Sequence, residues 1–333
     1  MDFFPTPPDQ HRPLAASLQQ AFGVPARLTR AAGENDNYFV ELADGRRAVL
    51  KLAEPGATRE RIDFEHAVVE AAEAAGLDVV LPRLLPGRQG DVVLALADEQ
   101  GRPRLGRLLQ LVPGHVWGQE VPAGAVRLRQ LGQVIGGLSM ALPGCDGPAA
   151  RVSHAWDLAM AGSHQQHLGA VDDAGRRALL QRLFDAWPAV QRALAAVPHS
   201  VIHGDLNDDN LLLQDGRLAG VLDFGDALWN PLVNDLAIAL AYVLLDEPQP
   251  WAAGAEVLAG YRTRRALQPA ELELLYPLLC LRLAVSVLTS ARRRRLDPGR
   301  AAWFVSERRA WAFLERHGGL HPAEVASRWS VAT

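Results

Sequence analysis

The sequence predicts an α+β protein in two parts, a smaller part rich in strands followed by a larger part rich in helices. Apolar segments of strand length dominate up to about residue 111, and segments with helical spacing follow. The chain has 333 residues, of which 49% are hydrophobic and 22% charged, as in soluble globular proteins large enough for two domains. Asp-Gly dipeptides at 44–45 and 215–216 each lie between apolar runs, which favours two β-hairpins.

The first part begins with a short helix over 13–22, which Pro13 opens and Gly23 closes. After it the pattern predicts strands over 26–32, 38–43 and 46–52, a helix over 57–75, and strands over 79–85, 91–97 and 104–111. We therefore expect an N-terminal lobe over 1–108, a connector over 109–114 and a C-terminal lobe over 115–333.

The second part is predicted to be mostly helical. Helices are expected over 124–141, 155–168, 173–196, 232–245, 251–261, 270–295 and 299–317. Pro188 should kink or split the third of these, because proline removes a helix hydrogen bond. The most apolar stretch, Leu272–Leu288, contains Glu273, Pro277 and Arg282 and is expected to be a buried helix, not a membrane span.

Composition excludes several classes of function. A net charge of −4 argues against a general nucleic-acid-binding protein, which is usually basic. The two cysteines, Cys145 and Cys280, have neither disulfide nor metal-site spacing, so a reducing, cytoplasmic location is expected. The proline-rich, acidic N-terminus does not have the pattern of a signal peptide.

The segment 201–226 contains two polar clusters on either side of the second Asp-Gly hairpin. Asp205 follows His203 and Gly204, and Asn210 comes five residues after Asp205. The second cluster begins at Asp223 and ends at Asp226. Asp205 is therefore available to hold a hydroxyl nucleophile, as phosphoryl transfer requires.

The hairpin register brings the two clusters together. If the turn is Asp215-Gly216, residues whose numbers sum to 431 face each other, so Asn210 lies opposite Val221. Asp223 then lies two residues further on the same face, roughly 7–8 Å from Asn210. An amide oxygen and a carboxylate at this spacing are suitable ligands for Mg²⁺, together with phosphates and water.

Lys51 is the only lysine of the chain, and it lies near the first Asp-Gly hairpin. A two-residue turn at 44–45 places it opposite Tyr38, beside the polar loop 33–37. Backbone N–H groups of this loop, at Gly33, Asn35 and Asn37, are candidates for binding nucleotide phosphates together with Lys51.

Three further positions complete the predicted site. Glu65, with Glu70 as the alternative, lies on the helix over 57–75 and is expected to pair with Lys51. Backbone groups from Gln110 to Val112 are expected to contact the nucleotide base. Asp235 opens an apolar helix, where we expect an N-cap with a second bond to the loop of Asp205.

The motif HGDxxxxN followed by DFGD resembles that of the aminoglycoside phosphotransferase superfamily, over about residues 25–318. The hydroxylysine kinase-like proteins also share the tripeptide Trp156-Asp157-Leu158. This resemblance implies a bilobal protein kinase-like fold with a small, mostly β N-lobe carrying one long helix and a larger, mostly α C-lobe. The residue roles it implies are Asp205 as catalytic base, Asn210 and Asp223 as Mg²⁺ ligands, Lys51 on the α/β-phosphates, Glu65 as its partner and His203 as a brace of the catalytic loop.

The chain also departs from related patterns. Loop 33–37 has one glycine, the choline-kinase pattern is absent, and only nine residues separate Gly225 from Asp235, too few for a peptide-docking segment. We therefore expect an Mg²⁺-dependent kinase of a small amino alcohol or hydroxyamino acid, with Asp226 as the candidate for the substrate ammonium and Asp208 as a weaker one.

The identity of the substrates stays open. The resemblance points to 5-hydroxylysine with GTP, while homoserine, ethanolamine- or choline-type alcohols, aminoglycosides and ATP are alternatives. Neither a nucleic acid nor a membrane is an expected partner. The competing class is a non-catalytic nucleotide-binding protein, and the presence of Lys51, Asp205, Asn210 and Asp223 together argues against it.

Overall fold

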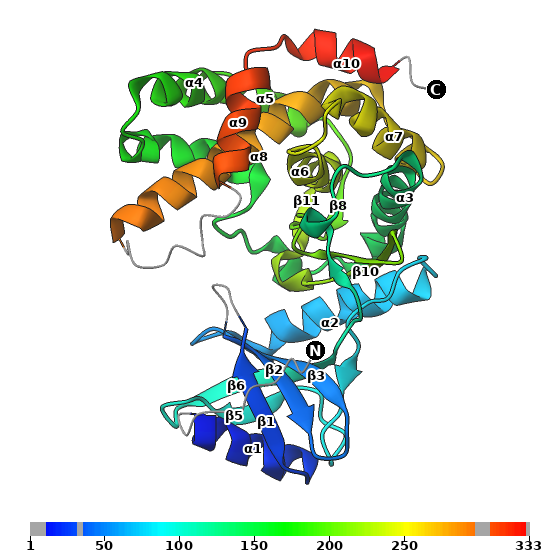
Figure 1. Cartoon of the computed structure of the whole chain (residues 1–333), viewed down its shortest axis with the longest axis vertical. Coiled ribbons are helices and arrows are strands. Elements are labelled where there is room, and N and C mark those ends of the chain that lie inside the picture. The colour runs from blue at the N-terminus through cyan, green and yellow to red at the C-terminus, as the bar shows by residue number, and fades with distance from the viewer. Residues whose placement is uncertain (1–10, 32–35, 297–306, 331–333) are drawn as a thin grey trace. The chain divides into compact units, whose positions relative to one another are not determined.

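The computed structural model describes residues 11–31, 36–296 and 307–330 and confirms the α+β class (Figure 1). The chain divides into two compact units, Met1–His66 with Leu81–Val112, and Ala67–Val80 with Pro113–Thr333. The division passes through helix α2 (Arg59–Ala74), so the second half of this helix groups with the helical unit.

The first unit is built on a six-stranded antiparallel sheet in the order β1-β2-β3-β6-β4, with β5 also paired to β6. Its other elements are one helix and the first half of α2. In chain order the elements are α1 (Arg12–Phe22), β1 (Ala26–Arg30), β2 (Asn37–Leu42), β3 (Arg47–Leu52), α2, β4 (Leu84–Leu85), β5 (Leu94–Ala97) and β6 (Pro103–Gln110).

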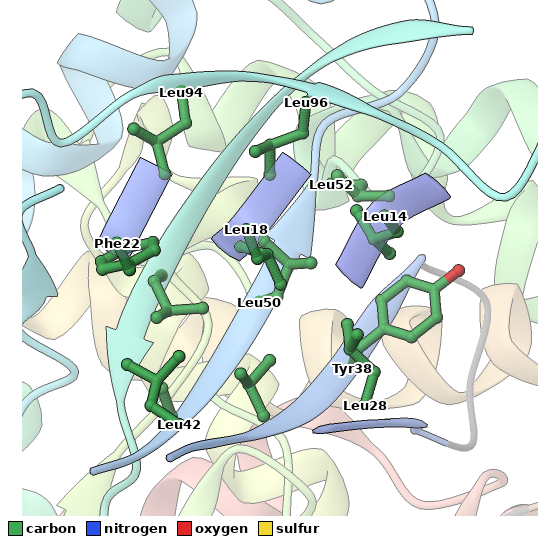
Figure 2. Close-up of a cluster of buried hydrophobic side chains, with 13 residues drawn as sticks. Leu14, Leu18, Phe22, Leu28, Tyr38, Leu42, Leu50, Leu52, Leu94 and Leu96 are labelled. Carbon is green, nitrogen blue, oxygen red and sulfur yellow. The ribbon is translucent and has the colours of Figure 1, made fainter. Parts of the chain in front are cut away.

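Helix α1 covers one face of this sheet, and their contact is the core of the unit (Figure 2). Leu14, Leu18 and Phe22 recur every four residues, so they share one face of the helix and pack against strand residues such as Leu50. Burying each such side chain stabilises the fold by about 1.5–3 kcal/mol. Along β3 every second residue is buried, which directs Lys51 to the face opposite this core.

The second unit is mostly helical and has two small sheets, β10-β9-β7 and β11-β8. Its strands are β7 (His115–Val116), β8 (His199–Ile202), β9 (Leu211–Gln214), β10 (Arg217–Val221) and β11 (Leu228–Pro231). Its α-helices are α3 (Ala125–Ala141), α4 (Ala174–Asp185), α5 (Trp187–Leu194), α6 (Val233–Val243), α7 (Pro250–Arg262), α8 (Pro269–Leu296), α9 (Glu307–His317) and α10 (Pro322–Ser330). The 3₁₀ segments are η2 (Trp117–Gln119), η3 (Leu142–Cys145), η4 (Pro148–Arg151), η5 (Leu158–Ala170) and η6 (Phe224–Asp226).

Helices α6 and α8 form the interior of this unit. Every residue of α6 is buried, and α8 packs against α6, η5, α9 and α10. By length and composition α8 could cross a membrane, but 89% of its apolar 18-residue stretch is buried inside the protein. It is therefore a core helix, as the polar residues in its sequence indicate.

Several predicted elements differ in detail. The predicted helix over 173–196 is split, and Pro188 lies in the first turn of α5, where its missing N–H costs nothing. The predicted helix over 155–168 is a 3₁₀ segment, and the predicted strand over 79–85 is reduced to β4 and a bridge from Val80 to Gly220. The first eight residues of the helix predicted over 299–317 lie outside the described residues, and α10 was not predicted.

Candidate active site

The loop after β8 contains Asp205, and its backbone is fastened on two sides. His203 is buried and uses both ring nitrogens: Nδ1 accepts from the Asp205 N–H at 3.2 Å and Nε2 donates to the Leu222 carbonyl at 2.9 Å. Its ring also packs on Phe224, with centroids 4.5 Å apart. His203 therefore links the loop of Asp205 to the end of the hairpin that carries Asp223.

Asp235 fastens the same loop from helix α6. Its two carboxylate oxygens accept the backbone N–H groups of His203 and Gly204, each at 2.8 Å. The predicted bond from Asp235 to the loop is confirmed, but the predicted N-cap role is wrong: α6 begins at Val233, and its N-cap has no side-chain bond. Burial raises the pKa of Asp235, and the two N–H bonds act in the opposite direction.

Gly204 lets two backbone segments meet at this point. Its φ is +83°, in the left-handed region that favours glycine, and a Cβ here would lie 2.4 Å from the backbone oxygen of Asp226. The two polar clusters of the sequence therefore meet through their backbones.

The Asp205 carboxylate accepts hydrogen bonds from three side chains. Asn207 and Asn210 donate to Oδ2 at 2.8 and 2.9 Å, and Arg282 donates to Oδ1 at 2.5 Å. Only a fifth of the Asp205 side chain is exposed. The carboxylate is thus fixed in direction, and because it has about four lone-pair positions, one stays available for a substrate.

The hairpin pairs Asn210 with a different residue from the one predicted. Asp215 and Gly216 have φ of +52° and +72°, so the predicted two-residue turn is confirmed, and Leu218 faces Leu213 as expected. A bulge at Ala219 then shifts the register by one, and the Asn210 carbonyl accepts from Leu222. The prediction that Asn210 lies opposite Val221 is wrong by this one residue.

The bulge has a cause outside the hairpin. The Ala219 carbonyl accepts from the Val80 N–H at 2.8 Å, and the Val221 N–H donates to the Val80 carbonyl at 3.2 Å. On the other side of the bulge, the Gln130 side chain bonds both backbone groups of Leu218. These outside partners compete with the regular ladder, so one residue of β10 is left unpaired with β9.

Asp223 follows directly, in an unusual conformation. Its φ is +56°, and its Oδ1 accepts from the Gly225 N–H at 3.1 Å, which caps η6. Asn210 uses its amide nitrogen on Asp205, so the amide oxygen is the atom suited to a cation. An amide oxygen and a carboxylate fit Mg²⁺, which takes few protein ligands, and no group of three or more His, Cys, Asp or Glu among the described residues forms a metal site of another kind.

Asp226 lies close to the other acids. Burial raises its pKa, and the negative charges of Asp205 and Asp223 raise it further, while His154 and Arg282 lower it. The His154 ring bonds the Asp226 backbone carbonyl at 3.1 Å. This concentration of negative charge in a half-buried position suits a small cation.

Asp208 has a different environment from the one predicted. Its carboxylate is only 5% exposed and accepts from Arg309 at 3.0 Å. The structure therefore shows it in a buried ion pair, and we do not include it in the substrate site.

Lys51 lies on β3 of the first unit, opposite Asn37 on one side and Arg107 on the other. The prediction that Lys51 lies opposite Tyr38 is wrong by one residue. Tyr38 faces Leu50, because the loop around Asp44 has three residues. The side chains of Lys51, Asn37 and Arg107 are cross-strand neighbours on one face of the sheet.

Glu65 of α2 contacts an arginine that the sequence did not single out. It accepts a hydrogen bond from Arg107, lies 3.6 Å from Arg61, and is close enough to Lys51 for that charge to lower its pKa. Burial is the larger effect, and it raises the pKa of Glu65. Glu65 is thus surrounded by three cations.

The other predicted nucleotide contacts are only partly described. Gly33 and Asn35 lie outside the described residues. Gln110 ends β6, its N–H donates to the Arg83 carbonyl at 2.7 Å, and Val112 is buried. A base at this segment would therefore meet backbone groups other than the Gln110 N–H.

Sequence reasoning missed Arg282 as a site residue. It lies in α8 within the most apolar stretch of the chain, and its side chain is 3% exposed. An arginine in such a stretch is a signal, because a buried charge needs a partner. The sequence does not say that the partner is Asp205, 77 residues away.

The chain is similar to known phosphotransferases over most of its length. The family model described as "Phosphotransferase enzyme family" (APH) matches residues 27–270. Hydroxylysine kinase of Mus musculus is 24% identical over 321 residues, covering 89% of this chain and 85% of its own. Homoserine kinase of Gluconobacter oxydans (strain 621H) is 31% identical over 262 residues, covering 77% of this chain and 78% of its own.

A solved structure gives the fold independently. The microcompartment-associated aminopropanol kinase superposes with a TM-score of 0.70 at 22% identity, covering 92% of this chain and 98% of its own. With the family match spanning most of the sequence, the chain belongs to the APH phosphotransferase family and is an enzyme of the small-molecule kinase type.

Proposed function

We propose that this enzyme transfers the γ-phosphoryl group of ATP or GTP to a hydroxyl group of a small amino alcohol or hydroxyamino acid, with Asp205 as catalytic base. The observation that carries the proposal is the Asp205 carboxylate, held by three side-chain donors. Asn210, a candidate metal ligand, is one of these donors. The Asn210 carbonyl also accepts from the Leu222 N–H, and Asp223, the other candidate ligand, is the residue after Leu222.

In this mechanism Asp205 accepts the proton of the substrate hydroxyl while the hydroxyl oxygen attacks the γ-phosphorus. The bond between that phosphorus and the β–γ bridging oxygen breaks, and a nucleoside diphosphate leaves. Asn210 and Asp223 would hold Mg²⁺, which neutralises phosphate charge when bound. Lys51 would contact the phosphates as a point charge, held in place by Glu65.

The amino group of the acceptor is assigned to Asp226. Burial and the negative charges of Asp205 and Asp223 raise the pKa of Asp226, and a cationic partner would favour its charged form. Trp156 is less suited to this role, because the guanidinium groups of Arg282 and Arg293 lie 5.0 and 5.7 Å from its ring centroid. Choline, whose quaternary ammonium group is usually bound by aromatic rings, would therefore need a ring other than that of Trp156.

Within this class, hydroxylysine and homoserine are the first acceptors to test, because proteins named for these substrates are similar over most of the chain. The free thiols of Cys145 and Cys280 favour a reducing, cytoplasmic location.

The test is nucleotide consumption with Mg²⁺ and either ATP or GTP, against 5-hydroxylysine, homoserine, 3-aminopropanol, choline and an aminoglycoside. Asp205→Asn, with the distant turn variant Asp215→Asn as control, is measured in parallel. We expect acceptor-dependent turnover that EDTA abolishes and that falls on the order of 10²–10⁴-fold in Asp205→Asn only. Equal turnover in Asp205→Asn and wild type would refute the role of Asp205.

A further inference from the structure

Arg282 is a buried cation whose guanidinium is held at three points. Nη2 donates to Asp205 Oδ1 at 2.5 Å, Nη1 to the Trp156 carbonyl at 3.0 Å, and Nε to the Tyr242 hydroxyl at 3.1 Å. The guanidinium carbon also lies 5.0 and 5.4 Å from the ring centroids of Trp156 and Tyr242. Its position is therefore fixed by three hydrogen bonds and two aromatic rings.

Apart from Asp205, Arg282 and the groups that hold it belong to rigid parts of the second unit. Arg282 itself is on the core helix α8, and Tyr242 is on the buried helix α6. The segment of Trp156 is fixed by its neighbour Asp157, whose carboxylate accepts from Asn230 at 2.7 Å, Ser153 at 2.8 Å and the Ala159 N–H at 2.9 Å.

Asp205, by contrast, is on a loop, and Arg282 is its one charged hydrogen-bond donor among the described contacts. Asn207 and Asn210 both bond Oδ2 and come from the same loop, so they would move with it. Only the bond to Oδ1 connects the carboxylate to a separate rigid element. Arg282 therefore ties the Oδ1 side of the carboxylate to helix α8 and, together with the two bonds to Oδ2, sets its rotation about the Cβ–Cγ bond.

We propose that Arg282 is the positioning residue of the catalytic base, which turns the Asp205 carboxylate so that an unused lone pair faces the acceptor hydroxyl. This inference rests on the proposed role of Asp205. It assigns to α8 a part in the reaction that lies outside the HGDxxxxN and DFGD motifs. The guanidinium itself does not contact the reacting atoms.

The decisive variants are Arg282→Met, which keeps much of the side-chain volume, and Arg282→Lys, which keeps the charge. Arg265 is the control, because its side chain is only 10% exposed and bonds a tyrosine hydroxyl and a carboxylate, those of Tyr261 at 2.9 Å and Glu271 at 2.8 Å. Arg265→Met removes a mostly buried arginine with no contact to Asp205. Tyr242→Phe removes one anchor of Arg282 and serves if Arg282→Met does not fold.

We expect kcat of Arg282→Met to fall on the order of 10²-fold, because a small displacement of a reacting group is enough for such a loss. The KM values for nucleotide and acceptor should stay within about threefold. Arg282→Lys should recover part of kcat, Tyr242→Phe should show a smaller fall in kcat, and Arg265→Met should lower Tm without lowering kcat of the folded enzyme. Crystal structures of the two methionine variants should show a displaced Asp205 carboxylate in Arg282→Met only.

The inference is overturned if Arg282→Met, or Tyr242→Phe in its place, keeps wild-type kcat, or if Asp205 is unmoved in its crystal structure. It is also overturned if Arg265→Met loses kcat to the same extent, since the effect would then be general to the fold. If no tested acceptor stimulates nucleotide consumption by the wild type, the proposed function fails. The inference about Arg282 is then decided by the position of Asp205 in the two crystal structures.

Discussion

The two Asp-Gly hairpins carry the same dipeptide but form different turns. At 215–216 both residues have positive φ, and the loop has two residues. At 44–45 only Gly45 does, at +88°, and Leu42 bonds Arg46 across a three-residue loop. At 44–45 the Asp44 carboxylate accepts from both the backbone N–H and Nε of Arg46, at 3.1 and 2.9 Å, which stabilises the longer loop.

This comparison shows that the dipeptide marks a hairpin but does not decide its register. Each hairpin carries a proposed site residue near its open end, Lys51 in one and Asn210 in the other, and each register differs by one residue from the prediction. The causes differ: loop length moves the partner of Lys51, and the bulge at Ala219 moves that of Asn210.

The largest expected effect comes from Asp223, the proposed metal ligand at the end of the hairpin around 215–216. Asp223→Asn keeps a residue that tolerates positive φ and removes the charge. We expect kcat to fall on the order of 10³-fold, since the proposed metal site would lose its charged ligand. Asp215→Asn, at the other end of the same hairpin, should leave kcat unchanged. Wild-type kcat in Asp223→Asn, with Mg²⁺ affinity retained, would remove Asp223 from the metal site.

The corresponding change in the first hairpin is Lys51→Met. Loss of one positive charge on the phosphates should lower kcat/KM for the nucleotide on the order of 10²-fold. Arg47→Met, at the start of the same strand, is the control because its side chain is exposed. If both variants lost activity equally, Lys51 would have no special role, and the effect would be one of strand stability.

Replacing the first turn residue tests the turns themselves. Asp215→Ala places alanine at a φ of +52°, so we expect a loss of about 1 kcal/mol in the free energy of unfolding, measured by denaturant titration. An unchanged midpoint would mean that the hairpin of the variant forms another turn, in which residue 215 avoids positive φ.

The smallest effect is expected for Asp44→Ala. Asp44 does not have positive φ, and its bonds to Arg46 are at the surface, where such pairs contribute little. The denaturation midpoint should therefore shift less than in Asp215→Ala. A larger shift at Asp44 than at Asp215 would show that the side-chain bonds, not the backbone conformation, control these hairpins.

Most of the proposed site could be predicted because it is local in sequence. Asp205, Asn210 and Asp223 lie within 19 residues of one another, where spacing and turn chemistry suffice. Arg282 and Arg107 could not be predicted, because they reach Asp205 and Glu65 across 77 and 42 residues. Asp235 was recognised as important, but its position in the first turn of α6, and hence its two backbone bonds, depends on where that helix begins.

The sequence by itself determined the α+β class, the order of most elements, the two hairpins and the acids of the second one, because these follow from periodicity and turn residues over short spans. The tertiary structure alone decided the register beside Asn210 and the partners of the buried charges. Bonds from Val80 and Gln130, which lie outside the hairpin, accompany the one-residue shift near Ala219, whereas the length of the local loop sets the register beside Lys51. A buried charge likewise takes the opposite charge that the fold brings within reach, and no local pattern names that partner.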